Sequence, residues 1–222
     1  MTYHFDFQPL ATYYRGFAGG IEVTLFLSVA SVALAAIMGL VVALGRLSRN
    51  RILSSVCGAY IEFLRNTPVL VQLVWIYYCL PIVIGVNLPG IQSAIIGLGL
   101  AESAYIAEII RAGILAIPRG QVEAARALGF SPIPILHHVV LPQAVRIMIP
   151  PFLNSYVSLL KATALVAIIA VPDLMYVAQR VTAITFRPIE ILTGAAVMYF
   201  LITYPIVLGV RVLERRVRLA LA

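Results

Sequence analysis

The sequence predicts an all-α integral membrane protein with five transmembrane helices. Of its 222 residues, 62% are hydrophobic and 11% are charged, whereas a soluble domain carries about 25% charged residues. Several uncharged stretches reach the roughly 20 residues that a helix needs to cross the hydrocarbon core of a bilayer. The polar segment over residues 119–142 interrupts these stretches and predicts a module outside the bilayer between helices 3 and 4.

The first half of the chain predicts three spans. Residues 1–20 are polar and aromatic, a composition that favours the membrane interface, so we expect a periplasmic interfacial segment there. The uncharged run from Val23 to Gly45 predicts the first span. The second span is expected to begin near Cys57 and to end at a break over Pro81 to Gly90, and the third to run from Ile91 to about Ala112.

The second half predicts two further spans. The fourth is expected from Ile147 to Pro172 and the fifth from Ile191 to Val210, joined by a polar connection over Asp173 to Pro188. The predicted division of the chain is therefore an interfacial segment (1–20), a transmembrane domain (21–215) and a cytoplasmic tail (216–222).

The module over residues 119–142 predicts two short helices with a sharp corner. Good helix formers begin at Glu123, and Gly129 stands where a left-handed cap would end the first helix. Ser131 and Pro132 are typical of a helix start, and Pro142 is expected to stop the second helix. A side chain at position 129 is expected to clash at the cap.

The positions of the cationic residues predict which side of the membrane each loop faces. Cytoplasmic loops are enriched in Lys and Arg. With the N-terminus outside and the C-terminus inside, three arginines lie outside and eleven lie inside, which places the 119–142 module in the cytoplasm. The outside set is Arg15, Arg180 and Arg187, and the inside set is Arg46, Arg49, Arg51, Arg111, Arg119, Arg126, Arg146, Arg211, Arg215, Arg216 and Arg218.

No catalytic or metal-binding constellation is recognisable, so we expect the chain not to be an enzyme. His137 and His138 are adjacent and face different sides of a helix, so they form no metal pair. The single lysine, Lys161, is followed by Ala162, which rules out a phosphate-binding loop of the G-x-x-x-x-G-K-[ST] type. The net charge of +7 comes from arginines at span ends, and we expect no nucleic-acid partner.

The spacing within the 119–142 module resembles the EAA signature, E-A-A-x3-G-x9-I-x-L-P, of the membrane subunits of ATP-binding-cassette (ABC) importers. The single departure is Val139, which stands in place of the usual Ile. The resemblance implies that this module docks on a separate ATPase subunit, with ATP and Mg²⁺ bound by that partner and no cofactor bound by this chain. The residues expected to couple the two subunits are Glu123, Ala124, Ala125, Gly129, Leu141 and Pro142.

Other segments resemble the polar amino-acid permeases of the histidine/glutamine/arginine type. These are Arg65–Gln72, with Asn66 in place of Gly, together with Ala104–Gly113 and Lys161–Thr163. The resemblance implies a multi-pass subunit of the bacterial inner membrane that pairs with an identical or a similar permease chain. It also implies two ATPase subunits and an extracytoplasmic substrate-binding protein.

Charged residues inside the spans suggest a substrate path. Burying an ionised group in a bilayer costs at least about 2.5–3.5 kcal/mol. Glu102 and Lys161 lie nearest the middle of their predicted spans, and they either contact the two charges of an amino acid or pair with each other. The irregular turn at Asn66, Thr67 and Pro68 is expected to offer backbone groups to the same cavity.

Two further pairs of charges are close in sequence. Glu108 with Arg111, and Glu62 with Arg65, are spaced three residues apart on predicted helices and can form simple ion pairs. The alternative function is a passive channel or facilitator for small polar solutes, which would need the polar span residues but no docking module. A membrane-embedded enzyme is a third class, for which the sequence offers no nucleophile–base or metal spacing.

Overall fold

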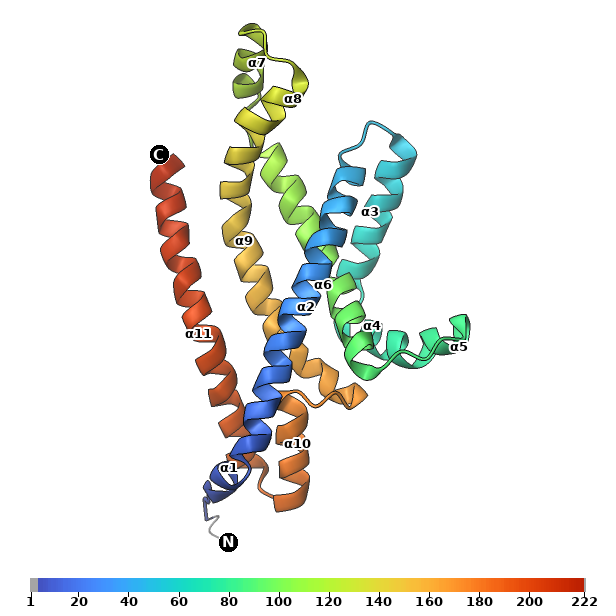
Figure 1. The fold of residues 1–222 in the computed structure, drawn as a ribbon, viewed down its shortest axis with the longest axis vertical. Coiled ribbons are helices and arrows are strands. Elements are labelled where there is room, and N and C mark those ends of the chain that lie inside the picture. The colour runs from blue at the N-terminus through green and yellow to red at the C-terminus, as the bar shows by residue number, and fades with distance from the viewer. Residues whose placement is uncertain (1–3, 222) are drawn as a thin grey trace.

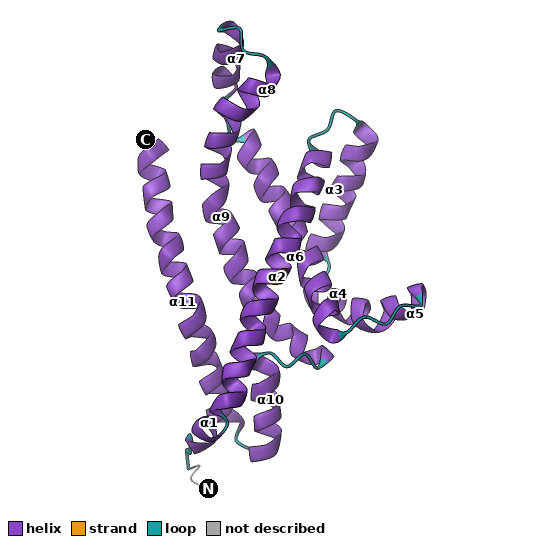
Figure 2. Cartoon of the chain, viewed as in Figure 1, coloured by secondary structure: helices purple, strands orange, loops and turns teal. Residues whose placement is uncertain are grey.

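A computed structural model describes residues 4–221, and for residues 215–221 it describes the helical backbone alone. The described chain contains helices and connecting loops and no β-strand (Figure 2). Four long helices set its length: α2 (Tyr14–Arg46), α6 (Gly90–Leu115), α9 (Leu141–Ala162) and α11 (Pro188–Leu221) (Figure 1). The predicted all-α class is therefore confirmed.

The helices also agree with the predicted number of membrane spans. Four are long and apolar enough to cross a bilayer, over Tyr14–Arg46, Gly90–Leu115, Pro132–Ile169 and Pro188–Glu214. A fifth candidate consists of α3 (Arg51–Asn66) and the helical stretch Val69–Ile84, which meet at an angle of 103°. The prediction of five spans holds when this bent pair is counted as one span.

The bend between α3 and the following helix has a local cause. The residue before a proline is disfavoured in the helical conformation, and Thr67, which precedes Pro68, is extended with φ −102° and ψ 132°. Polar side chains satisfy carbonyls that the bend frees: Thr67 Oγ1 donates to Phe63 O at 2.7 Å, and Gln72 Nε2 donates to Leu64 O and Thr67 O, each at 2.9 Å. The irregular turn predicted at Asn66, Thr67 and Pro68 is therefore confirmed, and the predicted second span is a bent pair of helices.

Two helices continue through prolines by way of wider, π-helical turns. After α4 (Val69–Val74), the π segment η1 (Trp75–Cys79) leads into α5 (Leu80–Ile84), in which Pro81 is the second residue. Similarly, α8 (Pro132–Pro134) and the π segment η2 (Ile135–Val140) lead into α9, whose second residue is Pro142. Proline lacks an N–H and clashes with the preceding turn, and a local π bulge relieves both problems. The predicted helix stop at Pro142 is therefore wrong.

The centre of the molecule is the packing of α2 on α6. Small residues let these backbones approach closely, as is typical of helix pairs in membranes. A Cβ on Gly39 would lie 2.8 Å from Ile106 Cγ2 and 2.9 Å from Ser103 O, and one on Gly99 would lie 2.8 Å from Leu34 Cδ2. A buried hydrophobic cluster forms where α2 and α6 pack together. It also includes residues of α4, of α9 and of the 3₁₀ segment η3 (Thr163–Ile169). Its members include Leu27, Leu73, Leu98, Leu159 and Val166.

The predicted polar connection over Asp173 to Pro188 contains a helix, α10 (Leu174–Thr185). Asp173 is fully buried and caps it by accepting a hydrogen bond from Tyr176 N at 2.8 Å, and its other oxygen accepts one from Tyr199 OH of α11 at 3.0 Å. Burial raises the pKa of the Asp173 carboxyl, and these hydrogen bonds offset part of the cost of burying it. The prediction of a polar connection did not include this helix, because the helix start that Asp173 marks was overlooked.

Close packing of α10 against α2 predicts the effect of two neighbouring substitutions. A Cβ on Gly20 would lie 2.9 Å from Leu174 Cα and 3.0 Å from Leu174 N, whereas a Cβ on Gly19 meets nothing within 4 Å. Gly20→Ala should destabilise the protein by about 1–3 kcal/mol, because backbone atoms must move. Gly19→Ala should be neutral or stabilising, because Ala favours the helix by about 0.5–1 kcal/mol.

Thermal unfolding of the two purified variants in detergent tests this prediction. The Tm of Gly19→Ala should equal or exceed that of the original protein, and the Tm of Gly20→Ala should be lower. Equal Tm values for the two variants would contradict the close approach of α10 to α2.

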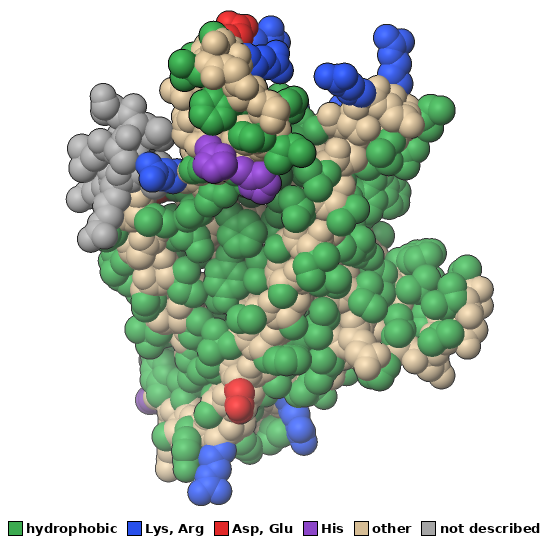
Figure 3. All heavy atoms as spheres, turned by 45° about the horizontal axis from the view of Figure 1, so that its top comes forward, with side chains coloured by type: hydrophobic (Ala, Val, Ile, Leu, Met, Phe, Trp, Pro, Cys, Tyr) green, Lys and Arg blue, Asp and Glu red, His purple; other side chains and the backbone are tan. Residues whose placement is uncertain are grey.

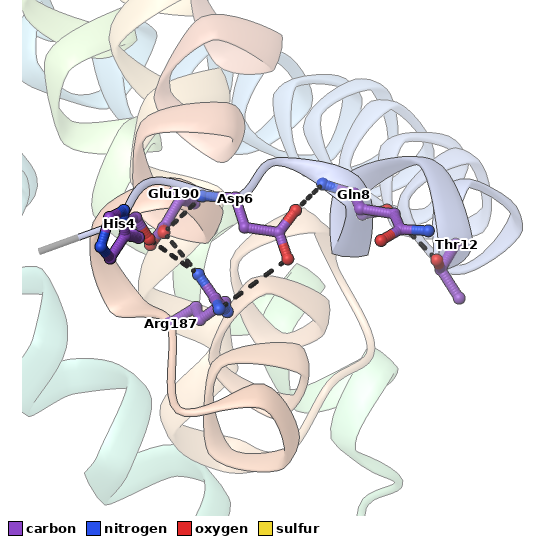
Figure 4. A network of polar contacts seen from close by, with 6 residues as sticks. All are labelled: His4, Asp6, Gln8, Thr12, Arg187 and Glu190. Carbon is purple, nitrogen blue, oxygen red and sulfur yellow. Dashed lines mark hydrogen bonds and ion pairs between the residues drawn. The ribbon is translucent and has the colours of Figure 1, made fainter.

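A polar network fastens the N-terminal segment to the start of α11 (Figure 4). Asp6 N donates to Glu190 Oε1 at 3.1 Å, and Arg187 Nη1 donates to the same Glu190 oxygen and to His4 O, each at 3.2 Å. Arg187 Nη2 also lies 3.8 Å from Asp6 Oδ2. The short helix α1 (Gln8–Thr12) follows, and α2 already begins at Tyr14, within the segment predicted to be interfacial.

The two ends of the molecule carry different elements (Figure 1). The N-terminus and α10 lie at one end, and α7 (Arg119–Ala127), α8 and the α2–α3 turn lie at the other, near the end of α11. In Figure 3, hydrophobic side chains cover the middle of the molecule, and Lys and Arg side chains gather near α7 and the α2–α3 turn, with others at the opposite end. The predicted tail, 216–222, lies outside the part of the chain whose side chains the structure describes.

Candidate functional site

A cavity of about 880 Å³ opens between α6 and α9, beside the bend of the α3–α4 pair. Its walls use one face of each long helix, because residues three, four and seven apart lie on the same side of a helix. Apolar side chains supply most of the lining. The polar lining residues are Arg65, Glu102, Glu108, Asn154, Ser155 and Ser158.

Glu102 is the buried acidic residue of this cavity. It is 8% exposed, and its carboxylate accepts a hydrogen bond from Ser155 Oγ, so it links α6 to α9 across the wall. An acidic group inside a membrane domain is costly unless it faces a partner or a water-filled cavity. The structure places this predicted residue against both a hydrogen-bond partner and a cavity.

Lys161 does not join Glu102. Its side chain is exposed, it does not line the cavity, and no ion pair between described residues includes it. It follows Ser158 by three residues on α9, so it lies near the cavity-facing side of that helix, but its side chain does not line the cavity. Within one chain, therefore, the structure does not assemble the predicted pair of Glu102 and Lys161.

The bend at Asn66, Thr67 and Pro68 borders the cavity, but these three residues do not line it. Asn66 Nδ2 donates to Glu62 O at 2.8 Å and to Glu62 Oε2 at 3.0 Å. The neighbours on either side of the bend, Arg65 and Val69, line the cavity instead. The backbone groups that the bend frees at Phe63, Leu64 and Thr67 are bonded by side chains of the same segment.

The cationic group inside the cavity is Arg65. Its guanidinium carbon lies 5.3 Å from the centre of the Tyr105 ring, a cation–π contact between α3 and α6. The predicted pairing of Arg65 with Glu62 is not formed among the described residues. The predicted pairing of Glu108 with Arg111 is confirmed, with Arg111 Nη2 at 2.8 Å from Glu108 Oε2.

The polar residues that α9 contributes to the cavity were not among the predicted site residues. Asn154, Ser155 and Ser158 stand at helical spacing inside an otherwise apolar span, and this spacing is the signal that could have identified them. Asn154 Nδ2 also donates to Glu214 Oε1 of α11 at 3.1 Å. Helix α9 is thus connected to α6 through Ser155 and to α11 through Asn154.

The module over residues 119–142 projects beyond the long helices as a helix–turn–helix (Figure 1). α7 ends in a Schellman motif, in which Gly129 N donates to Arg126 O at 2.9 Å and Phe130 N donates to Ala125 O at 3.1 Å. Gly129 has φ +84°, which confirms the predicted left-handed cap. The predicted clash is wrong, because a Cβ there would meet nothing within 4 Å. The backbone conformation is what favours glycine at this position.

The start of the second module helix is as predicted in its backbone. Ser131 is extended and Pro132 opens the helix, although the Ser131 side chain makes no cap hydrogen bond. Ala125 is buried where α7 packs on η2, whereas Glu123 and Ala124 are exposed. Gln143 Nε2 donates to Gln121 Oε1 at 3.1 Å, which ties α7 to the first turn of α9.

The tip of the module presents apolar side chains to its surroundings. Leu128 is 78% exposed and Ile133 is 71% exposed, and Phe130 is also exposed. A groove of about 460 Å³ runs beside them, lined in part by Ala124, Ala125 and Val139. Among the described residues, no three His, Cys, Asp or Glu side chains are placed to hold a metal ion.

Comparison with known proteins agrees with these features. Residues 31–219 match the family model described as the inner membrane component of binding-protein-dependent transport systems. The chain is 38% identical to the probable glutamine ABC transporter permease protein GlnM of Bacillus subtilis (strain 168), over 89% of this chain and 91% of that protein. It is 40% identical to the L-cystine transport system permease protein TcyB of the same organism, over 90% and 85% of the two chains.

The fold is also that of a solved transporter chain. A crystal structure described as an amino acid ABC transporter with histidines superposes with a TM-score of 0.90 at 36% identity, covering 96% of this chain and 100% of that chain. The family match covers most of the sequence, and the relatives match over nearly their whole length. The chain therefore belongs to the family of inner membrane components of binding-protein-dependent transport systems, and it is the membrane-spanning permease subunit of an ABC transporter.

Proposed function

We propose that this chain carries polar amino acids across the bacterial inner membrane, driven by ATP hydrolysis on a partner subunit. The observation that carries the proposal is the module over residues 119–142, which projects from the membrane domain and continues without a break into α9, a wall of the cavity. Relatives are named for the transport of glutamine, of L-cystine, and of histidine, lysine, arginine and ornithine.

In this proposal the module docks on the ATPase. Its exposed apolar tip, Leu128, Phe130 and Ile133, supplies the apolar contact area that a docking surface needs. Glu123 and Ala124 lie on the exposed side of α7, and Ala125 keeps α7 close to η2. Gly129 sets the corner, and Leu141 and Pro142 carry the second helix into α9. ATP and Mg²⁺ bind the ATPase, and this chain needs no cofactor of its own.

Movement of the docked module would reach the cavity through continuous helix. The Gln121–Gln143 hydrogen bond holds α7 against the start of α9, and Ser155 further along α9 bonds Glu102 on α6. Closure of the ATPase pair on ATP would therefore shift α9 relative to α6. A shift between these helices changes the opening of the cavity that they line, which is a shear type of gating.

The cavity offers groups of both signs to an amino acid. The Glu102 carboxylate can accept a hydrogen bond from the substrate ammonium, and Arg65 supplies a guanidinium for the substrate carboxylate. Lys161 has an exposed ammonium without an ion pair to any described residue. It therefore stays a candidate for binding the substrate carboxylate at the C-terminal end of α9. The bend at Asn66, Thr67 and Pro68 positions Arg65 and Val69 on the cavity wall.

Five helices and a cavity open on one side do not enclose a gated path, so two permease chains must pair. The pair is either a homodimer or a heterodimer with a similar chain, and the complete transporter adds two ATPase subunits and an extracytoplasmic substrate-binding protein. Purifying the tagged chain from its native membrane and identifying co-purifying proteins by mass spectrometry tests this composition. Recovery of the permease without any ATPase under mild detergent would contradict it.

The proposed orientation has the N-terminus outside and the module in the cytoplasm, and it predicts a labelling pattern. In a variant without Cys57 and Cys79, cysteine at Thr12 or Ala183 should react with an impermeant maleimide in intact cells. Cysteine at Ser131 should react only after the membrane is opened. All three positions are exposed, so accessibility within the chain does not explain a difference. The reverse pattern would place the module outside the cell and contradict ATPase docking.

A further inference from the structure

A second, polar cavity of about 370 Å³ lies between α2, α3 and α6, at the end of the molecule that carries the 119–142 module. It shares Arg65 and Glu108 with the cavity described above, but its other walls come from the α2–α3 hairpin and the end of α6. We call it the arginine niche. The lining residues that matter here are Arg46, Ser55, Gly58, Glu62, Arg65 and Arg111.

The charges of the arginine niche do not cancel. Arg111 is neutralised by Glu108, which it contacts at 2.8 Å. Arg46 donates to two neutral acceptors, Ser54 O at 3.2 Å and Ser54 Oγ at 2.9 Å, and Arg65 lies on the Tyr105 ring. Neither Arg46 nor Arg65 forms an ion pair with a described residue. Three guanidinium groups and two carboxylates leave the niche with one net positive charge.

The structure holds Arg46 in place across the hairpin. A Cβ on Gly58 would lie 3.2 Å from the guanidinium carbon of Arg46, so the absent side chain lets this arginine lie flat on α3. Together with its two bonds to Ser54, this contact aims the guanidinium toward the niche from the end of α2.

The outer face of α3 beside the niche is apolar and exposed. Ile52, Val56 and Phe63 are each more than 60% exposed, and in a membrane-spanning chain such side chains meet lipid acyl chains. Basic pockets between transmembrane helices at the membrane surface are typical sites for anionic lipid head groups.

We propose that the arginine niche binds the phosphodiester of one anionic phospholipid of the phosphatidylglycerol type, with its acyl chains against α3. The single negative charge of that head group balances the single net positive charge of the niche. A zwitterionic phosphatidylcholine or a free zwitterionic amino acid adds no net charge and leaves the niche unbalanced. The inference rests on the membrane location of the chain, and it is tested at Arg46 because Arg65 also lines the proposed substrate cavity.

Native mass spectrometry of the purified full-length chain in detergent tests the proposal. The protein is titrated with phosphatidylglycerol or with phosphatidylcholine of the same acyl chains, and the lipid-bound fraction is measured. The expected result is preferential retention of phosphatidylglycerol. Arg46→Gln should weaken it about fivefold, the effect of removing one cationic side chain beside an anionic lipid surface.

Two control variants show whether a change in lipid retention comes from a specific site, from general surface charge or from misfolding. Arg49→Gln makes the same charge change three residues away, outside the niche, and should leave retention unchanged. Glu62→Gln raises the net charge of the niche and should strengthen retention, a gain that a misfolded protein cannot imitate. Equal weakening by Arg49→Gln, weaker retention in Glu62→Gln, or equal retention of both lipids would overturn the proposal. Displacement by millimolar inorganic phosphate would also overturn it in favour of a soluble phosphate ligand.

Discussion

Gly129→Val is expected to abolish ATP-driven uptake while the protein still inserts into the membrane. Gly129 has φ +84° with open space around it, so the cost comes from the backbone. A non-glycine residue in the left-handed region costs about 1–2 kcal/mol, and a β-branched one is among the least tolerated. Relief of that strain would change the backbone turn between α7 and α8, and the exposed tip of the module would then move away from the ATPase. The measurement is uptake, together with stimulation of ATP hydrolysis by the loaded binding protein.

Two control variants identify the backbone as the cause. Gly129→Asn should keep most of the uptake, because Asn accepts the left-handed conformation more readily than other residues. Gly120→Ala should keep it as well, since Gly120 lies in α7 with equally open space and no positive φ. Normal stimulation of the ATPase in Gly129→Val would contradict the coupling role of the module.

Glu102→Gln is expected to cause the second large loss of uptake. The change keeps the size of the side chain and its hydrogen-bonding contact with Ser155 but removes the negative charge that faces the cavity. A charged hydrogen bond contributes about 1.5–3 kcal/mol, so uptake at low substrate concentration should fall by roughly tenfold or more. ATP hydrolysis should still respond to the loaded binding protein, because the module is untouched.

A double substitution distinguishes substrate contact from a structural ion pair. Lys161 and Glu102 form no ion pair within the described chain, so Glu102→Gln with Lys161→Gln should be at least as inactive as the worse single variant. Recovery of uptake in the double variant would show that the two charges balance each other, across the subunit interface or after a rearrangement. It would also remove both residues from the substrate site.

Features set by a few neighbouring residues were predictable from the sequence. Gly129 and Pro132 define the corner of the module through local backbone preferences, and the Glu108–Arg111 pair follows from helical spacing. The long apolar runs likewise predicted the four unbroken spans among the five expected, although α2 begins six residues before the end of the segment assigned to the interface.

Features that depend on direction or on distant contacts were not predictable. Pro68 signals an irregular turn, but the 103° change of direction depends on what the next helix packs against. The π-helical turn η2 lets the helix continue past Pro142, although a proline at this position predicts that the helix ends. The packing of α9 on α6 brings Ser155, not Lys161, to Glu102, and the local sequence pattern does not specify which residues of two helices meet.

ATP-driven import is tested most directly by uptake into proteoliposomes that contain the purified permease with its co-purified ATPase subunits. The binding protein and radiolabelled glutamine or histidine are supplied outside, and ATP is supplied on the side of the ATPase. The amino acid is expected to accumulate above its external concentration, and this accumulation should require ATP and the binding protein and be lost in Gly129→Val. Equilibration of the amino acid without ATP, at the same rate in Gly129→Val, would contradict it and indicate a passive facilitator.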